Sequence, residues 1–153
     1  MFNVVLVEPE IPPNTGNIGR LCLATGSTLH LIKPLGFSLN DRQLRRAGLD
    51  YWSEADVQVW DSLTQLQSTQ VSNARCFFLT TKLGRAYWDV EFRRGDFLVF
   101  GRETKGLPKD LLAKHSDECL TIPMYATRSL NLATAVAIVL FEAVRQQRLR
   151  VHG

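Results

Sequence analysis

The feature that most constrains this sequence is a C-terminal helical segment that is apolar on more than one side. Its apolar residues fall into two stripes, the first made by Leu132, Val136, Val139, Leu140 and Ala143 and the second by Ala137, Ile138, Phe141 and Val144. One sheet covers only one face of a helix, so we expect the first stripe in the core and the second in a homodimer interface. A helix buried on both sides within one monomer is the alternative.

A short polar turn precedes this helix and is a candidate ligand site. It contains Thr127, Arg128, Ser129 and Asn131. Because the first backbone N–H groups of a helix have no partner within the helix, we expect Ser129 or Asn131 to cap it. The same unpaired donors allow a polar ligand to dock at the mouth of the helix.

Short apolar runs alternate with helical patterns along the rest of the chain. We expect strands at residues 2–7, 29–32, 57–60, 76–80, 97–100 and 120–122, and helices at 40–48, 62–70 and 109–115. This alternation predicts an α/β fold with a mostly parallel sheet flanked by helices. Ligands of such sheets bind beyond the carboxyl ends of the strands, where loops follow Leu79, Phe100 and Ile122.

The segment after the first strand is rich in proline. Three prolines occur within five residues, so we expect a loop there, followed by a helix that Asn14 and Thr15 cap and Gly26 ends. Gly16 and Gly19 lie in the first turn of that helix. Because an interior glycine costs a helix up to about 1 kcal/mol, we expect a substrate or another backbone to approach closely at these positions.

Length and composition favour one soluble domain. The chain has 153 residues, 45% of them hydrophobic, so we expect a single domain spanning residues 1–153. The net charge of +3 is too small to demonstrate a nucleic-acid partner. Three scattered cysteines in apolar surroundings indicate reduced thiols, and the absence of zinc-site spacings predicts no metal. Without a membrane-spanning or signal segment, we expect no membrane association and a cytoplasmic location.

A basic helix is followed closely by two aromatic residues. Residues 40–48 carry three arginines, and Tyr51 and Trp52 follow this segment after two intervening residues. Cations beside aromatic rings suit phosphate contacts combined with base stacking. A solvated helix next to a packed tryptophan gives the same pattern and stays open as an alternative.

Two glycine patterns fail the tests for familiar phosphate-binding loops. Gly101 and Gly106 have the spacing of a P-loop, but Leu107 and Pro108 follow where lysine and a hydroxyl residue are required. The segment 16–19 lacks the leading glycine of a dinucleotide-binding motif. An NAD-dependent oxidoreductase is therefore the weakest of the readings.

Three segments, in order and spread over almost the whole chain, carry a family resemblance. They are Asn14-Thr-Gly-Asn-Ile-Gly-Arg20, Phe97-Leu-Val-Phe-Gly-Arg-Glu-Thr-Lys-Gly-Leu-Pro108, and residues 122–132, which begin Ile-Pro-Met and end Ser-Leu-Asn-Leu. Together they resemble the motifs of the SPOUT superfamily of RNA ribose methyltransferases. Residues 8–17 and 44–51 resemble its small TrmL/YibK type, which methylates the 2′-oxygen of the wobble nucleotide, cytidine or uridine 34, of tRNA.

The resemblance implies a fold and a cofactor that the patterns alone do not predict. It implies a deep trefoil knot in the C-terminal part, although knots are essentially absent from most folds. It implies S-adenosyl-L-methionine as cofactor, with S-adenosyl-L-homocysteine as product, held by backbone around Leu79, Gly101 and Ile122 with Ser129 nearby. It also implies homodimers whose sites are completed across the interface.

The resemblance assigns roles to individual residues. Arg20 is the implied activator of the ribose hydroxyl, Ser129 and Asn131 position the cofactor and its motif, and Glu103 supports the second motif. Arginine is effectively never deprotonated, so we interpret Arg20 as a phosphate and alkoxide ligand rather than as a literal base. Candidate contacts to the tRNA backbone are Lys33, Arg42, Arg45 and Arg46.

Two positions depart from the family's pattern. Arg102 stands where relatives usually have proline or a small residue, and Gly19 where they often have a bulkier one.

Three hypotheses for the function rank ahead of the oxidoreductase. The first is 2′-O-methylation of the wobble nucleotide of tRNA, with leucine isoacceptors expected as substrates. The second keeps the chemistry but moves it to another tRNA position or to rRNA. The third is an RNA-binding module without catalysis.

Overall fold

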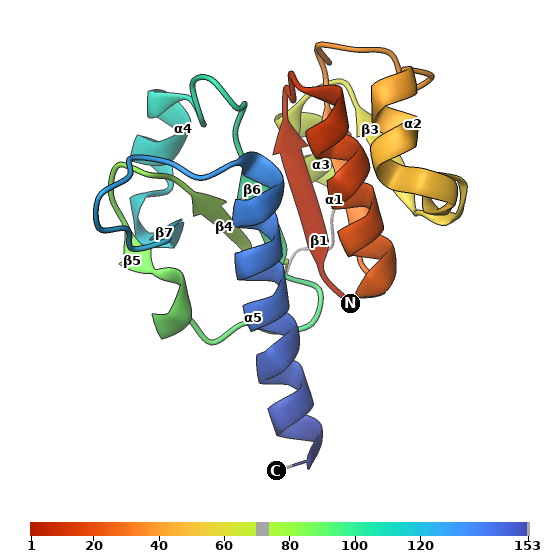
Figure 1. The fold of residues 1–153 in the computed structure, drawn as a ribbon. Helices are drawn as coiled ribbons and strands as arrows, with labels where there is room; N and C mark the ends of the chain where they lie inside the picture. The colour runs from red at the N-terminus through yellow and green to blue at the C-terminus, as the bar shows by residue number, and fades with distance from the viewer. Residues whose placement is uncertain (70–73, 153) are drawn as a thin grey trace.

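The computed structural model describes residues 1–69 and 74–152 and has an α/β architecture (Figure 1). Within these residues, seven strands form one sheet in the order β3-β2-β1-β6-β4-β7-β5, with parallel neighbours throughout. The strands are β1 (Asn3–Val7), β2 (Thr28–Ile32), β3 (Val57–Trp60), β4 (Cys76–Leu79), β5 (Arg85–Ala86), β6 (Phe97–Phe100) and β7 (Cys119–Thr121). The predicted parallel sheet is confirmed.

Helices cover both faces of this sheet. The α-helices are α1 (Pro12–Ala24), α2 (Arg42–Gly48), α3 (Leu63–Thr69), α4 (Lys109–Lys114) and α5 (Leu132–His152), and the 3-10 helices are η1 (Leu49–Glu54), η2 (Tyr87–Asp89) and η3 (Ser116–Glu118). Alternate residues of β1 enter opposite cores: Val4 and Leu6 pack in the cluster that includes α1 and α5, and Val5 packs with Leu66 and Leu112 of α3 and α4. Central strands are therefore apolar on both faces, as the sequence predicts.

The first helix begins earlier than predicted. Pro12 and Pro13 form its first turn, so the expected loop through residue 14 is wrong. Proline is tolerated there because the first N–H groups of a helix lack helical partners anyway. The expected caps are also wrong: Ile11 occupies the N-cap position, and no side chain caps the helix. At the other end, Gly26 follows the helix with a φ of 61°.

The close approach of another backbone is confirmed at Gly16, where α2 makes it, whereas Gly19 faces a side chain, the Trp52 ring. Because α1 begins at Pro12, the prediction that both glycines lie in its first turn is wrong. A Cβ atom at Gly16 would lie 2.1 Å from the Leu44 carbonyl oxygen of α2. The Asp41 carboxylate caps α2 by accepting from the backbone N–H groups of Gln43 and Leu44. The glycine at position 16 therefore lets α2 and its basic residues lie directly against α1.

Three further predictions have different outcomes. The short edge strand β5 was not predicted, because two residues are too few to show a period. The predicted helix 62–70 corresponds to α3, but its last residue, Gln70, lies outside the described residues. The chain returns from β7 to α5, which packs against α1 and β6. This arrangement is consistent with the C-terminal knot, which stays a prediction.

The described residues include no helix with the length and apolar content needed to cross a membrane.

Candidate functional site

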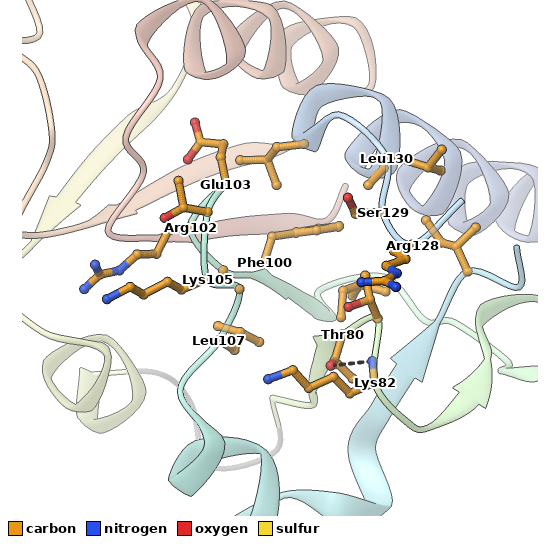
Figure 2. Close-up of a pocket in the computed structure, with 18 of the residues that line it drawn as sticks. Thr80, Lys82, Phe100, Arg102, Glu103, Lys105, Leu107, Arg128, Ser129 and Leu130 are labelled. Carbon is orange, nitrogen blue, oxygen red and sulfur yellow. Dashed lines mark hydrogen bonds between the residues drawn. The ribbon is translucent and has the colours of Figure 1, made fainter. Parts of the chain in front are cut away.

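Three loops enclose a cavity of about 910 Å³ at the carboxyl ends of β4, β6 and β7. These strands are neighbours in the sheet, so the loops that follow them meet at one edge, as predicted. Figure 2 shows Thr80 of the loop after β4, Phe100 at the end of β6 and Ser129 of the loop before α5 around this space. The four residues expected at the cofactor all line the cavity, namely Leu79, Gly101, Ile122 and Ser129.

A very tight turn forms one wall of the cavity. A Cβ atom at Gly101 would lie 2.1 Å from the Gly106 carbonyl carbon, closer than real atoms approach. The Gly106 N–H donates to the Arg102 carbonyl oxygen at 2.8 Å, and Gly106 has a φ of 65°. Glycine at both ends therefore lets the main chain double back and present itself to the cavity.

Glu103 ties this turn to the start of α1. Its carboxylate accepts from the Glu10 N–H at 2.9 Å and the Ile11 N–H at 2.7 Å, and the Asn14 side-chain amide lies 3.4 Å away. A carboxylate at a helix N-terminus is favoured by the helix dipole. These bonds fit the supporting role expected for Glu103, which holds two motif segments together.

The N-terminal loop makes reciprocal contacts that the sequence analysis missed. The Glu10 carboxylate accepts from the Thr104 N–H at 3.0 Å and from the Thr104 hydroxyl at 2.7 Å. The hydrogen bond from the Thr104 side chain lowers the pKa of Glu10 below its ordinary value. Glu8 pairs with Arg102, which accounts for one departure from the family pattern. The sequence signal for these contacts is a pair of acidic residues, Glu8 and Glu10, on either side of Pro9 and directly after a buried strand.

Asn131 joins the cavity to α1 and caps α5. Its side-chain oxygen accepts from the Thr134 N–H at 3.2 Å, so of the two predicted caps Asn131 is the observed one. Its side-chain amide donates to the Asn14 side-chain oxygen at 3.0 Å. Ser129 is exposed and lines the cavity instead. The two residues predicted to act at the helix mouth thus have different surroundings.

Arg20 lies in a second, adjoining groove of about 790 Å³ rather than in the cavity. Tyr51 and Ala137 also line this groove, and Asn131 lines both spaces. The exposed Arg20 guanidinium lies 5.7 Å from the centroid of the Tyr51 ring, within range of a cation–π contact. The structure therefore brings Arg20 beside the predicted cofactor residues without placing it among them.

The two aromatic residues after the basic helix have different roles. Trp52 is only 9% exposed, and a Cβ atom at Gly19 would lie 2.6 Å from its ring. Gly19 therefore makes room for a packed tryptophan, which explains the second departure from the family pattern. The alternative of a packed tryptophan is right for Trp52, whereas Tyr51 is 50% exposed and free to contact a ligand.

The basic residues proposed for the tRNA backbone are exposed, and they stay predictions. Three of them lie on α2, which packs against α1. Lys33 pairs with Asp61 at 3.5 Å, and Arg45 donates to the Asn40 side-chain oxygen at 3.1 Å. Lys33 and Arg45 stay exposed to solvent in these contacts, and contacts as exposed as these contribute little to the stability of the fold. The four residues are Lys33, Arg42, Arg45 and Arg46.

The two stripes of α5 differ in burial. Val136, Val139, Leu140 and Ala143 are completely buried. On the second stripe Phe141 is 45% exposed, and the other members are partly exposed. Within the described residues, the expected core position of the first stripe is confirmed for these four, whereas its fifth member, Leu132, is only partly buried, and the second stripe is partly exposed. No group of three or more metal-ligating side chains is found in the same part of the chain.

The fold and the cavity define a class. A parallel α/β sheet with a ligand-sized cavity enclosed by three loops at its carboxyl edge is the architecture of a nucleotide-type cofactor enzyme. The sequence matches the SpoU rRNA Methylase family over residues 1–141. The chain belongs to this family.

Similar proteins of known sequence or structure agree with this membership. The tRNA (cytidine(34)-2′-O)-methyltransferase of Yersinia pestis is 52% identical over 154 residues, which cover 95% of this chain and 94% of the relative. A solved structure that concerns the 2-OH methylation of C/U34 on tRNA has a TM-score of 0.93 and 44% identity and covers 97% of each chain. The SpoU methyltransferase AviRb from Streptomyces viridochromogenes, solved with AdoMet, has a TM-score of 0.83 at 24% identity. The match covers 95% of this chain and 57% of AviRb, and it shows a common fold.

Proposed function

We propose that this protein is an S-adenosyl-L-methionine-dependent methyltransferase that methylates the 2′-oxygen of the wobble nucleotide of tRNA. The substrate nucleotide is cytidine or a modified uridine at position 34, and the substrate tRNAs are leucine isoacceptors. The observation that carries the proposal is the meeting of the three motif segments at one cavity, in a chain half identical to a tRNA (cytidine(34)-2′-O)-methyltransferase over almost its full length. Because tRNA is the substrate, we expect the enzyme in the cytoplasm.

The cavity fits the cofactor in size and chemistry. Its volume lies within the range of ligand pockets, about 300–1,000 Å³. Leu79 and Ile122 provide apolar walls for an adenine ring, and the Gly101 turn offers main-chain hydrogen-bonding groups close to it. Ser129 lies at the edge nearest the α5 mouth. When bound, S-adenosyl-L-methionine supplies a methyl group on a sulfonium leaving group.

The protein's own contribution to the reaction is positioning and charge stabilisation. With S-adenosyl-L-methionine bound, the ribose 2′-oxygen would accept its methyl group, S-adenosyl-L-homocysteine would leave, and the hydroxyl proton would pass to solvent. Holding the oxygen in line with the bond between the methyl carbon and the sulfur supplies much of the acceleration. Arg20 binds the phosphate next to the target ribose and stabilises the negative charge that develops on the 2′-oxygen.

The remaining site residues connect the cavity to α1, the helix that carries Arg20. Asn131 borders both the cavity and the Arg20 groove and is bonded to Asn14 of α1. Glu103 fixes the cofactor turn to the start of the same helix. We assign both as positioning residues, which keep α1 and Arg20 in register with the cofactor.

The protein functions as a homodimer in this proposal. The second stripe of α5 supports it, because Phe141 is a large exposed apolar residue on a helix whose opposite face is buried. Ala137 belongs to this stripe and also lines the Arg20 groove. A second copy seated on the stripe would therefore adjoin the acceptor site. The tRNA backbone contacts of α2 complete the substrate surface.

One alternative has an observation in its favour. The matched family is described by its action on rRNA, so the same chemistry on an rRNA nucleotide is the second candidate. The test is to sequence and digest RNA from cells lacking this gene and to measure 2′-O-methyl nucleosides by mass spectrometry. We expect position 34 of leucine tRNAs to lose its methyl group and to regain it with the wild-type gene but not with Arg20→Ala. Loss at an rRNA position, with position 34 intact, would establish the alternative.

A further inference from the structure

The rim of the cofactor cavity carries an excess of positive charge. The cavity lining includes five cationic side chains but one carboxylate: Lys82, Arg102, Lys105, Lys109 and Arg128 against Glu103. Arg102 is paired with Glu8, and the carboxylate of Glu103 is engaged by backbone N–H groups. Four cations are left, one from the loop after β4, two from the segment after β6 and one from the loop before α5.

These four cations are exposed and form no ion pair within the described residues. Lys105 lies close enough to Glu10 to help lower its pKa, but it does not pair with it. Figure 2 shows Lys105 and Arg128 on opposite sides of the cavity, with Lys82 below. A cofactor with a single carboxylate uses at most one of them. The remaining like charges repel one another unless a polyanion is bound.

The structure of the acceptor nucleotide indicates that the anion bound at this rim is a phosphate. The 2′-oxygen and the 3′-phosphate are on neighbouring carbons of one ribose. A nucleotide whose 2′-oxygen reaches the methyl group therefore brings at least one phosphate to the opening of the cavity. The α2 cations do not line the cavity, and α1 lies between α2 and α5 (Figure 1), so they are not placed to bind this phosphate alone.

An exposed aromatic residue lies in the same loop as Arg128. Tyr125 is completely exposed in the loop between β7 and α5, three residues before Arg128. An exposed aromatic ring next to cations is the arrangement with which proteins bind unpaired nucleotides, by stacking a base while cations hold the backbone. Anticodon-loop nucleotides are unpaired and suit such a surface.

We infer that Lys82, Lys105, Arg128 and Tyr125 form a second RNA-binding surface at the cavity rim, which holds the phosphates flanking the target nucleotide and stacks a neighbouring base. This inference rests on the proposed function and extends it, because the surface is separate from the α2 set. Lys82, Lys105 and Arg128 are the phosphate contacts. Tyr125 is the stacking platform.

The test is the salt dependence of tRNA binding. Each lost phosphate contact should reduce the slope of log K against log salt concentration by about 0.7. The triple variant Lys82→Gln, Lys105→Gln, Arg128→Gln should therefore lose about 2 from the slope and bind tRNA at least roughly tenfold more weakly at low salt. Arg94→Gln is the matched control, because Arg94 is exposed at the opposite, amino-terminal edge of the sheet. It should leave affinity and slope almost unchanged.

Cofactor affinity, measured by calorimetry on the same proteins, separates the outcomes. A triple variant with a wild-type salt slope would overturn the inference, and so would one that loses cofactor affinity but keeps its slope. Tyr125→Ala should weaken tRNA binding at least about fivefold, whereas Tyr125→Phe should retain it, because stacking needs only the ring. Failure of the wild-type protein to methylate any tRNA would count against the proposed function instead.

Discussion

The cofactor cavity and the Arg20 groove adjoin each other but are built in different ways. The cavity is shaped by main chain, in turns so tight that Gly101 has no space for a Cβ atom. The groove is shaped by exposed side chains, Arg20 and Tyr51, and by Ala137 of the second, partly exposed stripe of α5. If the proposed function holds, the difference teaches that cofactor binding depends on backbone shape, whereas the acceptor chemistry depends on the Arg20 side chain and its surroundings.

The largest effect is expected at Arg20. Arg20→Ala should reduce the single-turnover rate of methyl transfer about 10²- to 10³-fold, because a group that stabilises developing charge is lost. The cofactor dissociation constant should stay near the wild-type value, since Arg20 does not line the cavity. Arg20→Lys should recover part of the rate if charge is what matters. An equally inactive Lys variant would contradict the electrostatic role, and Arg94→Ala is the control.

A smaller effect, on cofactor binding, is expected at the tight turn. Gly101→Ala should weaken cofactor binding at least roughly tenfold, because an inserted methyl group forces the backbone to shift. Isothermal titration calorimetry measures this directly, and a thermal unfolding curve checks that the protein is folded. Gly26→Ala is the control. Gly26 does not line the cavity, and although its positive φ strains an alanine, the added methyl group would meet no other atom within 4 Å. Unchanged cofactor affinity in Gly101→Ala would break the distinction between the two regions.

The second stripe of α5, beside the groove, gives the third prediction. Phe141→Glu should shift the protein from dimer to monomer in analytical ultracentrifugation and lower methyl transfer several-fold at micromolar concentration, because a buried charge at an interface is unfavourable. Val59→Glu makes the same chemical change at an exposed apolar residue of β3 and serves as the control. A Phe141→Glu protein that stays dimeric would show that the second stripe is not the interface.

The smallest effect is expected at the contact between the cavity turn and the segment before α1, where Glu10 accepts from Thr104. The pKa of Glu10 is lowered by its hydrogen bonds to Thr104, so this contact is fully present above the ordinary pKa of 4.5 and is lost as pH falls through the lower folded-state value. Cofactor affinity should be constant from neutral pH to about 5 and weaken below that, roughly twofold, because the pair is exposed. Glu10→Gln should remove the acid dependence, and Glu54→Gln should retain it.

The cavity was predictable from the sequence because its determinants are local. Strand ends at Leu79 and Phe100 follow from short apolar runs, and in a parallel sheet their loops meet at one edge. The apolar excess of α5 likewise predicted a stripe that its own sheet does not cover. Each of these features depends only on a pattern within about twenty consecutive residues.

The contacts between distant segments were not predictable in the same way. Glu103 and Ile11 are 92 positions apart, and no periodicity links them. The burial of Trp52 depends on the absence of a side chain at Gly19, which a propensity pattern does not register. Three clustered prolines predict a loop, but α1 starts at Pro12, because the first turn of a helix accepts proline.

The most direct test of the central claim is methyl transfer from labelled S-adenosyl-L-methionine to purified tRNA that lacks the modification, with the labelled nucleotide mapped by mass spectrometry. The account predicts label on the ribose of nucleotide 34, absent with Arg20→Ala although that variant still binds the cofactor. Label on a base, label at another position, or equal transfer by Arg20→Ala would contradict it.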